Sequence, residues 1–155
     1  MTTIVPGKPV PDFTLPATGG KAVSLAGLRG SPVVLYFYPK DDTPGCTTEG
    51  CGFRDHHGSF RKLSAVVLGV SRDSMTAHEK FKARYEFPFD LLSDANEQLC
   101  RLFDVMREKN MYGRKVMGVE RSTFLIDSKG VLRQEWRKVK VDGHVEAVLA
   151  AVKAL

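Results

Sequence analysis

Hydrophobic residues gather into three short runs along the chain, at residues 33–38, 65–71 and 122–127. These runs are rich in Val, Leu and aromatic residues and alternate little with polar residues, which is typical of strands covered on both faces. A shorter apolar run at residues 89–92 predicts one further strand. We therefore expect a central sheet enclosed between layers of other elements.

A helix is predicted between the first two runs. Thr43 followed by Pro44 indicates its start, with Thr as the N-cap and Pro at the first helical position. Phe53, Phe60 and Leu63 continue the pattern at roughly helical spacing. The pattern predicts one helix from Thr43 to Leu63.

The remaining pattern completes an α/β arrangement. Residues 122–127 and 131–136 flank a turn with Gly130 and predict a hairpin. Further helices are expected at residues 74–85, 94–104 and 145–155. The Pro-rich N-terminal segment is expected to be irregular. Together these elements predict an α/β fold with a central mixed β-sheet flanked by helices.

The composition suits a single compact domain. The chain has 155 residues, of which 43% are hydrophobic and 26% charged. This length is sufficient for one domain, 1–155, with its own buried core. No apolar stretch approaches the ~18 residues that span a bilayer, and the N-terminus lacks the basic and apolar regions of a signal peptide. We therefore expect a cytoplasmic protein with no membrane partner.

The chain is basic, with 23 Lys and Arg against 18 Asp and Glu and a net charge of +5. These basic residues are spread along the chain and interleaved with acidic ones, and no nucleic-acid-binding motif accompanies them. The charge is therefore interpreted as a surface property, and no nucleic-acid partner is expected.

Three cysteines stand at positions 46, 51 and 100, so at least one thiol is left without a partner inside the chain. In a reducing compartment, cysteines are more often catalytic, redox-active or metal-binding than structural. Cys100 falls beside the apolar stripe of its predicted helix. We expect it to be a half-buried structural thiol.

Cys46 has the environment of a reactive thiol. Counted from Thr43, it lies in the first turn of the predicted helix, where free backbone N–H groups and the helix dipole favour a thiolate. The Thr43 hydroxyl could also bond the sulfur or an oxygen beside it, and Gly45 keeps the approach open. A lowered pKa contributes at most ~30-fold to the thiolate fraction at neutral pH, so further groups must stabilise the transition state.

Cys51 lies five residues after Cys46, and an ideal helix would separate their Cα atoms by roughly 8.6 Å. A disulfide usually requires less than ~7 Å. A bond between these two cysteines would therefore require the first helical turns to unwind. Gly45, Gly50 and Gly52 lower the cost of unwinding, because each glycine weakens a helix by up to ~1 kcal/mol relative to alanine.

The segment PKDDTPGC carries the Pro-x-x-x-Thr-x-x-Cys signature of peroxiredoxins, and the longer run FYPKDDTPGCTTEGCGFRD is similar to the bacterioferritin-comigratory, or PrxQ, subfamily. Downstream, GVSRDS, PFDLLSD and RSTFLIDSKGVLR resemble the same subfamily in the same order. The resemblance covers roughly residues 5–150. It implies a thioredoxin-like fold and a thiol peroxidase activity.

The resemblance also implies roles for individual residues. It makes Cys46 the peroxidatic cysteine and Cys51 the resolving cysteine, which together form an intramolecular disulfide. It implies that the Thr43 hydroxyl holds the thiolate and the peroxide and that Arg121 is the arginine of the pocket. Pro39 would shield the pocket, and the Glu49 carboxyl would orient Arg121.

The partners implied are a hydroperoxide substrate and thioredoxin or a similar dithiol reductant, with no cofactor and no metal. A monomer suffices, because both working cysteines lie in one chain. His56 and His57 are interpreted as surface or capping residues, and His78 and His144 have no companions at ligand spacing.

Two other functions stay open at this point. A thioredoxin-like copper-binding chaperone usually carries Cys-x-x-x-Cys, whereas four residues separate Cys46 from Cys51 here. A general disulfide oxidoreductase usually carries Cys-x-x-Cys.

Overall fold

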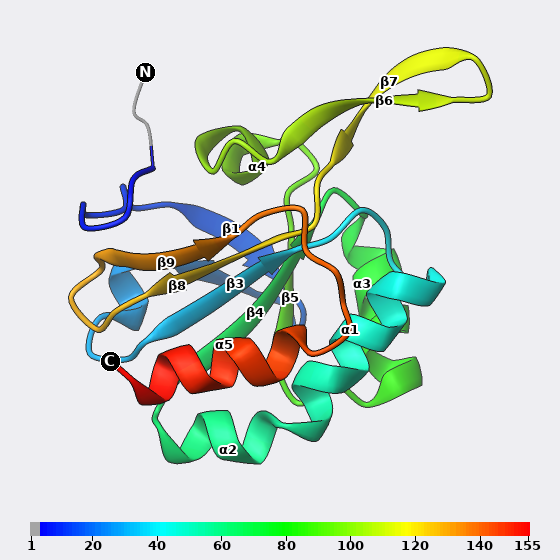
Figure 1. The fold of residues 1–155 in the computed structure, drawn as a ribbon. Helices are drawn as coiled ribbons and strands as arrows, with labels where there is room; N and C mark the ends of the chain where they lie inside the picture. Colours follow the sequence, from blue (N-terminus) through cyan, green and yellow to red (C-terminus); the bar gives the residue numbers. More distant parts are fainter. Residues whose placement is uncertain (1–3) are drawn as a thin grey trace.

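The computed structural model describes residues 4–155 and centres on a seven-stranded mixed sheet with the strand order β2-β1-β5-β4-β3-β8-β9 (Figure 1). The strands are β1 (Thr14–Ala17), β2 (Lys21–Ser24), β3 (Val33–Phe37), β4 (Val66–Ser71), β5 (Asp90–Ser93), β8 (Ser122–Ile126) and β9 (Leu132–Trp136). The pairs β3–β4 and β4–β5 are parallel, and the others are antiparallel.

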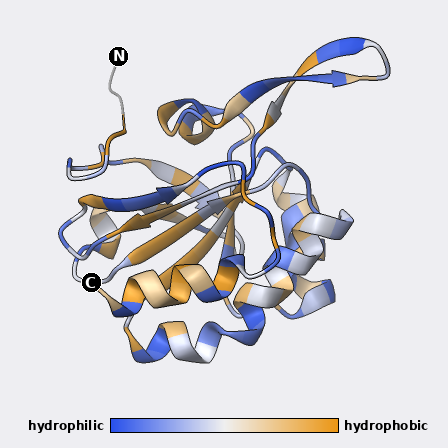
Figure 2. Ribbon diagram, in the orientation of Figure 1, coloured by the Kyte–Doolittle hydropathy of each residue, from blue (hydrophilic) through white to orange (hydrophobic). Residues whose placement is uncertain are grey.

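The central strand β3 is buried on both faces, as the unbroken apolar run predicts. Val34 and Tyr36 belong to one hydrophobic cluster and Leu35 and Phe37 to the other, because successive side chains of a strand point to opposite faces. Figure 2 shows the hydrophobic central strands enclosed by the surrounding elements.

Four helices pack on the face of the sheet that carries Tyr36, through residues of its cluster. They are α1 (Pro44–Asp55), α2 (His57–Lys62), α3 (Met75–Tyr85) and α5 (His144–Lys153). The opposite face is covered by α4 (Gln98–Leu102) and by the N-terminal segment, in which Ala26–Leu28 form the 3₁₀ turn η1. The α/β fold class with a mixed sheet between helices is confirmed.

Most of the predicted elements are present. The apolar runs form β3, β4 and β8, the short run forms β5, and β8 and β9 pair as the expected hairpin. Helix α3 begins after Ser74, whose side chain accepts a hydrogen bond from the Ala77 N–H at 3.2 Å. Among residues 4–155, no helix has the length and hydrophobicity needed to cross a membrane.

The single helix predicted from Thr43 to Leu63 is wrong, because the structure breaks it at His56 into α1 and α2. The His56 backbone leaves helical geometry with φ −98° and ψ 3°. Its imidazole Nδ1 lies 3.0 Å from the carbonyl oxygen of Gly52, the same oxygen that its backbone N–H bonds. Apolar spacing continues through this point, so periodicity alone does not reveal the break.

The helix predicted at residues 94–104 is also too long. The Asp94 carboxylate accepts hydrogen bonds from the backbone N–H groups of Leu99 and Cys100, at 3.0 and 2.7 Å. Glu97 adopts a left-handed conformation with φ 60° immediately before α4. The first residues of the predicted helix therefore form a turn whose carboxylate caps α4.

Two hairpins were not expected. The N-terminal segment is not irregular throughout, because β1 and β2 pair across a turn in which Gly19 and Gly20 take φ values of 85° and 72°. A second hairpin, formed by β6 (Met106–Met111) and β7 (Arg114–Val119), is a separate two-stranded sheet that projects from the fold (Figure 1). Half of the residues in its strands are polar and most are exposed, so the strands lack the hydrophobic pattern of a buried strand.

Candidate active site

Cys46 is the third residue of α1 and is 2% exposed. Strand β3 leads into a short loop, and α1 starts at Thr43, which takes the extended N-cap conformation with φ −99° and ψ 157°. The thiol therefore lies where the helix dipole and the first-turn N–H groups favour a negative charge. It is buried on the side of the sheet covered by four helices.

Arg121, just before β8, lies beside this sulfur although 75 positions separate it from Cys46 in sequence. Its Nη2 donates to Cys46 Sγ at 3.4 Å, and its Nη1 donates to Glu49 Oε1 at 2.7 Å. Burial opposes the charge of the guanidinium, but Glu49 and Cys46 outweigh it and raise the pKa of Arg121. One permanent cation thus bridges a thiol and a carboxyl.

Glu49 is fully buried on the same helix as Cys46. Burial raises the pKa of Glu49 to about 7, although the charge and hydrogen bond of Arg121 act in the opposite direction. Its second oxygen, Oε2, has no hydrogen-bond partner. This carboxyl therefore changes its protonation close to neutral pH.

His144, the first residue of α5, faces the free oxygen of Glu49. Its Nε2 lies 4.0 Å from Glu49 Oε2 and 2.8 Å from the hydroxyl oxygen of Thr123, which is fully buried on β8. Burial, together with the charge of Arg121, lowers the pKa of His144 to about 4. The ring of Trp136 on β9 packs edge-on against this imidazole, with centroids 5.8 Å apart. Sequence reasoning missed His144 in this role, because the contact joins two distant helices.

Thr43 and Gly45 frame the approach to the sulfur. The Thr43 hydroxyl donates to the carbonyl oxygen of Lys40 at 2.7 Å, so its hydrogen does not point to the sulfur. Its oxygen accepts no capping hydrogen bond from the N–H groups of α1. A Cβ atom on Gly45 would lie 3.0 Å from Arg121 Nη2. Pro39 is half-buried in the loop that follows β3.

The other two cysteines are placed very differently. Cys51 is half-buried on α1, and all three cysteines are free thiols. Cys100 is fully buried rather than half-buried, so the expectation of partial exposure is wrong. Burial raises the pKa of the Cys100 thiol, and the neighbouring Asp94 raises it further. Cys100 belongs to the cluster on the opposite face of the sheet from Cys46.

Two consecutive carboxylates anchor the loop before α1. Asp41 accepts a hydrogen bond from the Tyr38 hydroxyl at 2.6 Å and pairs with His78 Nδ1 at 2.6 Å. Asp42 bonds Arg84 at 2.6 Å and the Tyr85 hydroxyl at 2.9 Å. His78, Arg84 and Tyr85 all lie on α3, so these hydrogen bonds hold the loop against that helix.

Asp41, Asp73 and His78 bring possible metal-ligand atoms within 4.8 Å of one another. Each group already has partners inside the protein. Asp73 Oδ2 accepts from the Asp41 N–H at 2.9 Å, and His78 Nε2 donates to the Leu92 carbonyl at 2.9 Å. We therefore interpret this group as part of the loop anchor.

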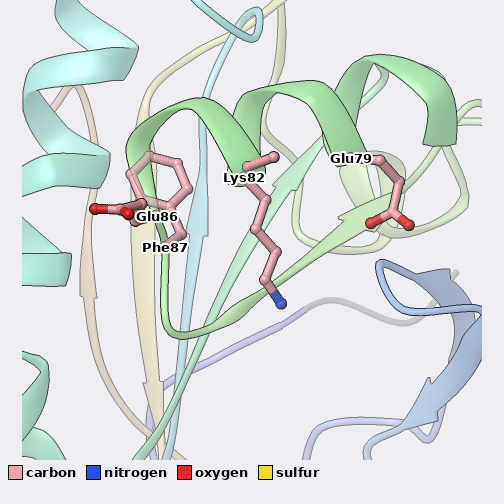
Figure 3. Close-up of a pocket in the computed structure, with 5 residues that line it drawn as sticks. Glu79, Lys82, Glu86 and Phe87 are labelled. Atoms are coloured by element: carbon pink, nitrogen blue, oxygen red, sulfur yellow. The ribbon is translucent and has the colours of Figure 1, made fainter.

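A hollow of about 460 Å³ lies along α3, lined by Glu79, Lys82, Ala83, Glu86 and Phe87 (Figure 3). Phe87 connects it to α1, because a Cβ atom on Gly50 would lie only 2.5 Å from Phe87 Cζ. None of the three cysteines lines this hollow.

Known proteins resemble this chain over nearly its whole length. The AhpC/TSA family matches residues 6–135. Peroxiredoxin Bcp of Xanthomonas campestris is 53% identical over 156 residues, which cover 99% of this chain and 98% of that protein. Peroxiredoxin Bcp of Bacillus subtilis is 52% identical over 151 residues, with 97% and 96% covered.

A solved structure of the Xanthomonas campestris bacterioferritin comigratory protein, which has alkyl peroxide reduction activity, has a TM-score of 0.88 to this chain. The two are 54% identical, and the match covers 92% of this chain and 90% of the other.

A buried cysteine at a helix start that accepts a hydrogen bond from an arginine has the environment of a reactive thiol. With the relatives above, this makes the protein a thiol peroxidase. The chain belongs to the AhpC/TSA family, among the peroxiredoxins of the Bcp, or PrxQ, group. The thiol peroxidase activity and thioredoxin-like fold that the resemblance implies are thereby confirmed.

Proposed function

We propose that this peroxiredoxin reduces hydrogen peroxide and organic hydroperoxides through a sulfenic acid on Cys46, which Cys51 converts into an intramolecular disulfide. The observation that carries the proposal is the 3.4 Å contact between Arg121 Nη2 and Cys46 Sγ at the start of α1. The alkyl peroxide reduction ascribed to the Xanthomonas relative supports organic hydroperoxides as substrates.

In the first step, the Cys46 thiolate attacks the terminal oxygen of the hydroperoxide. The S–O bond forms as the O–O bond breaks, and an alcohol or water leaves. Arg121 and the N–H groups of the first helical turn stabilise the thiolate and the negative charge that develops on oxygen. The Thr43 hydroxyl has committed its hydrogen to Lys40, so its oxygen can accept a hydrogen bond from the hydroperoxide O–H. Pro39 shields the pocket.

In the second step, the Cys51 thiol condenses with the sulfenic acid, and water leaves as the disulfide forms. The two Cα atoms lie too far apart in an intact helix, so the start of α1 must unwind. Thioredoxin or a similar dithiol then reduces the disulfide. Both cysteines lie in one chain, which supports a monomer, and reversible thiol chemistry suits the reducing cytoplasm.

The test is peroxide consumption coupled to thioredoxin, thioredoxin reductase and NADPH. We expect no turnover for Cys46→Ser. For Cys51→Ser we expect a sulfenic acid that accumulates and no intramolecular disulfide. Cys100→Ser is the matched control, because this thiol lies on the other face of the sheet. Sustained turnover by Cys46→Ser would overturn the proposal.

A further inference from the structure

The buried site around Cys46 contains two acids and one cation. Arg121 bonds Cys46 Sγ with one nitrogen and Glu49 Oε1 with the other, at 3.4 and 2.7 Å. In the part of the chain that the structure describes, Glu49 has no other cationic hydrogen-bond partner, and its Oε2 has none at all. A thiolate and a carboxylate would therefore compete for one positive charge in a closed site.

The groups facing Glu49 from the neighbouring elements add no second cation at neutral pH. Burial and Arg121 lower the pKa of His144 on α5 to about 4, so this imidazole is neutral. Burial and Glu49 raise the pKa of the Tyr36 phenol on β3, so this group is neutral as well. Cys46 on α1 and Arg121 beside β8 complete the set. The charges balance when one of the two acids is ionised and the other is protonated.

Two acids that accept hydrogen bonds from the same buried cation are coupled and titrate as a pair. From this arrangement we propose that Cys46 and Glu49 share a single proton, and that Glu49 gives this proton up when Cys46 is oxidised. Glu49 is then a positioning residue that acts through Arg121, and it also balances the charge of the reaction. This inference rests on the proposed role of Cys46 as the attacking thiol.

The proton balance of the step follows. In the form that reacts, the shared proton lies on Glu49 and Cys46 is the thiolate. The thiolate sulfur bonds the terminal oxygen, the O–O bond breaks, and the sulfur is oxidised to a neutral sulfenic acid while the peroxide is reduced. Arg121 loses its anionic partner at sulfur, so the Glu49 proton is released and the leaving alkoxide or hydroxide gains one. The net charge of the site is the same before and after.

The pH dependence of Cys46 alkylation tests the shared proton. Glu49→Gln keeps the shape of the side chain and a hydrogen-bond acceptor for Arg121 but removes the competing charge. Because the carboxylate no longer competes for Arg121, we expect Cys46 alkylation across the neutral pH range to be several-fold faster in this variant. Loss of a merely structural group would lower the thermal stability without accelerating alkylation. An unchanged or slower alkylation of Glu49→Gln would overturn the inference.

Proton uptake during a single turnover tests the release step. The parent for this experiment is Cys51→Ser, in which the sulfenic acid persists, mixed with equimolar hydrogen peroxide in weak buffer with an indicator dye at about pH 8. At this pH, Glu49 beside a neutral sulfur is mostly ionised. We expect almost no net proton uptake by the parent and about one proton per oxidised Cys46 when Glu49→Gln is added.

Glu146→Gln in the same background is the matched control, because it removes one negative charge from an exposed side chain of α5. We expect it to match the parent. Equal proton uptake by the parent and the Glu49→Gln variant would overturn the release step. Failure of the parent to form a sulfenic acid would instead overturn the proposed role of Cys46, so the two failures are distinguishable.

Discussion

The guanidinium of Arg121 has a geometry that an ammonium cannot reproduce. Its two terminal nitrogens bond two different acidic groups at once, Cys46 Sγ and Glu49 Oε1. A lysine would bring the same charge but only one flexible point of contact. The site therefore depends on the shape of the cation as well as on its charge.

We expect Arg121→Lys to lower kcat/KM for hydrogen peroxide by about 100-fold, as the loss of one positioned donor does in other active sites. Steady-state and stopped-flow peroxide consumption measure the effect. Arg133→Lys is the control, because Arg133 pairs with Asp127 beside the β8–β9 turn. A loss in kcat/KM of less than about threefold for Arg121→Lys, well below the usual effect of removing such a donor, would contradict the expectation.

Glu49 and His144 affect folding stability in opposite directions as the pH changes. The pKa of Glu49 is raised in the folded state from 4.5 to about 7, so its proton favours folding at low pH and this contribution is lost as the pH rises through 7. The pKa of His144 is lowered from 6.5 to about 4, so its contribution is present above pH 6.5 and is lost as the pH falls towards 4.

Glu49→Gln should therefore gain stability relative to the parent as the pH rises from 5 to 8, by up to an amount on the order of 3 kcal/mol. The difference in melting temperature between the two proteins, measured across this pH range, tests the expectation. If the difference in melting temperature between Glu49→Gln and the parent is constant or shrinks with rising pH, burial does not destabilise the ionised form of Glu49.

The residues at the sulfur could be predicted only in part. The motif PKDDTPGC singles out Cys46 and its helix start, but only the resemblance to a family connects Arg121 with it, because 75 positions separate the two. The position of His144 against Glu49 depends on how α5 packs on α1. Such a contact leaves no spacing in the sequence that could reveal it.

Helix α1 combines weak helix formers with close packing. Gly50 faces Phe87, where a Cβ atom would lie 2.5 Å from the ring, and Gly52 faces Val145, where it would lie 3.0 Å from a methyl group. These glycines thus have two effects: they allow neighbouring elements to approach, and they make the helix easier to unwind. The close approach of the neighbouring elements stabilises the reduced fold. The easier unwinding serves the disulfide formation that we propose.

Gly50→Ala should lower the free energy of unfolding by ~1 kcal/mol, because overpacking against Phe87 costs more than the helix propensity of alanine contributes. Gly58→Ala is the matched control, since no atom lies within 4 Å of a Cβ there, and we expect it to be neutral or stabilising. Denaturant unfolding of both variants checks the pair. A Gly50→Ala protein that is more stable than Gly58→Ala would be the contrary result.

Elements with a strong apolar pattern were predicted well, and elements fixed by single polar contacts were not. The run of β3 specifies a strand buried on both faces. The break at His56 and the cap of α4 by Asp94 depend on individual hydrogen bonds, which periodicity does not detect. The β6–β7 hairpin has no buried face along most of its length, so its sequence carries no period of two.

The sheet divides the interior of the molecule into two hydrophobic clusters with different roles. Cys46 lies in the cluster enclosed by α1, α2, α3 and α5, together with the aromatic residues around Tyr36. Cys100 lies in the other cluster, with Leu99 and Phe103. Because a seven-stranded sheet separates them, the thiol of Cys100 has no route to Cys46 within the folded chain.

Cys100→Ala should therefore leave peroxidase turnover unchanged while lowering the free energy of unfolding by ~1–2 kcal/mol, through the small cavity it leaves. Turnover assays and thermal unfolding measure the two effects. Iodoacetamide should label Cys100 only after unfolding, since the side chain is fully buried. A disulfide that involves Cys100 in the oxidised protein would contradict this division.

The edge-on packing of Trp136 against His144 gives the protein an internal optical probe. Trp136 is the single tryptophan of the chain, and its ring contacts the imidazole that faces Glu49. Tryptophan emission depends on nearby polar and charged groups, so ionisation of Glu49 and rearrangement of α1 would each change its intensity. The catalytic cycle should therefore be visible as a time course of fluorescence in the unlabelled protein.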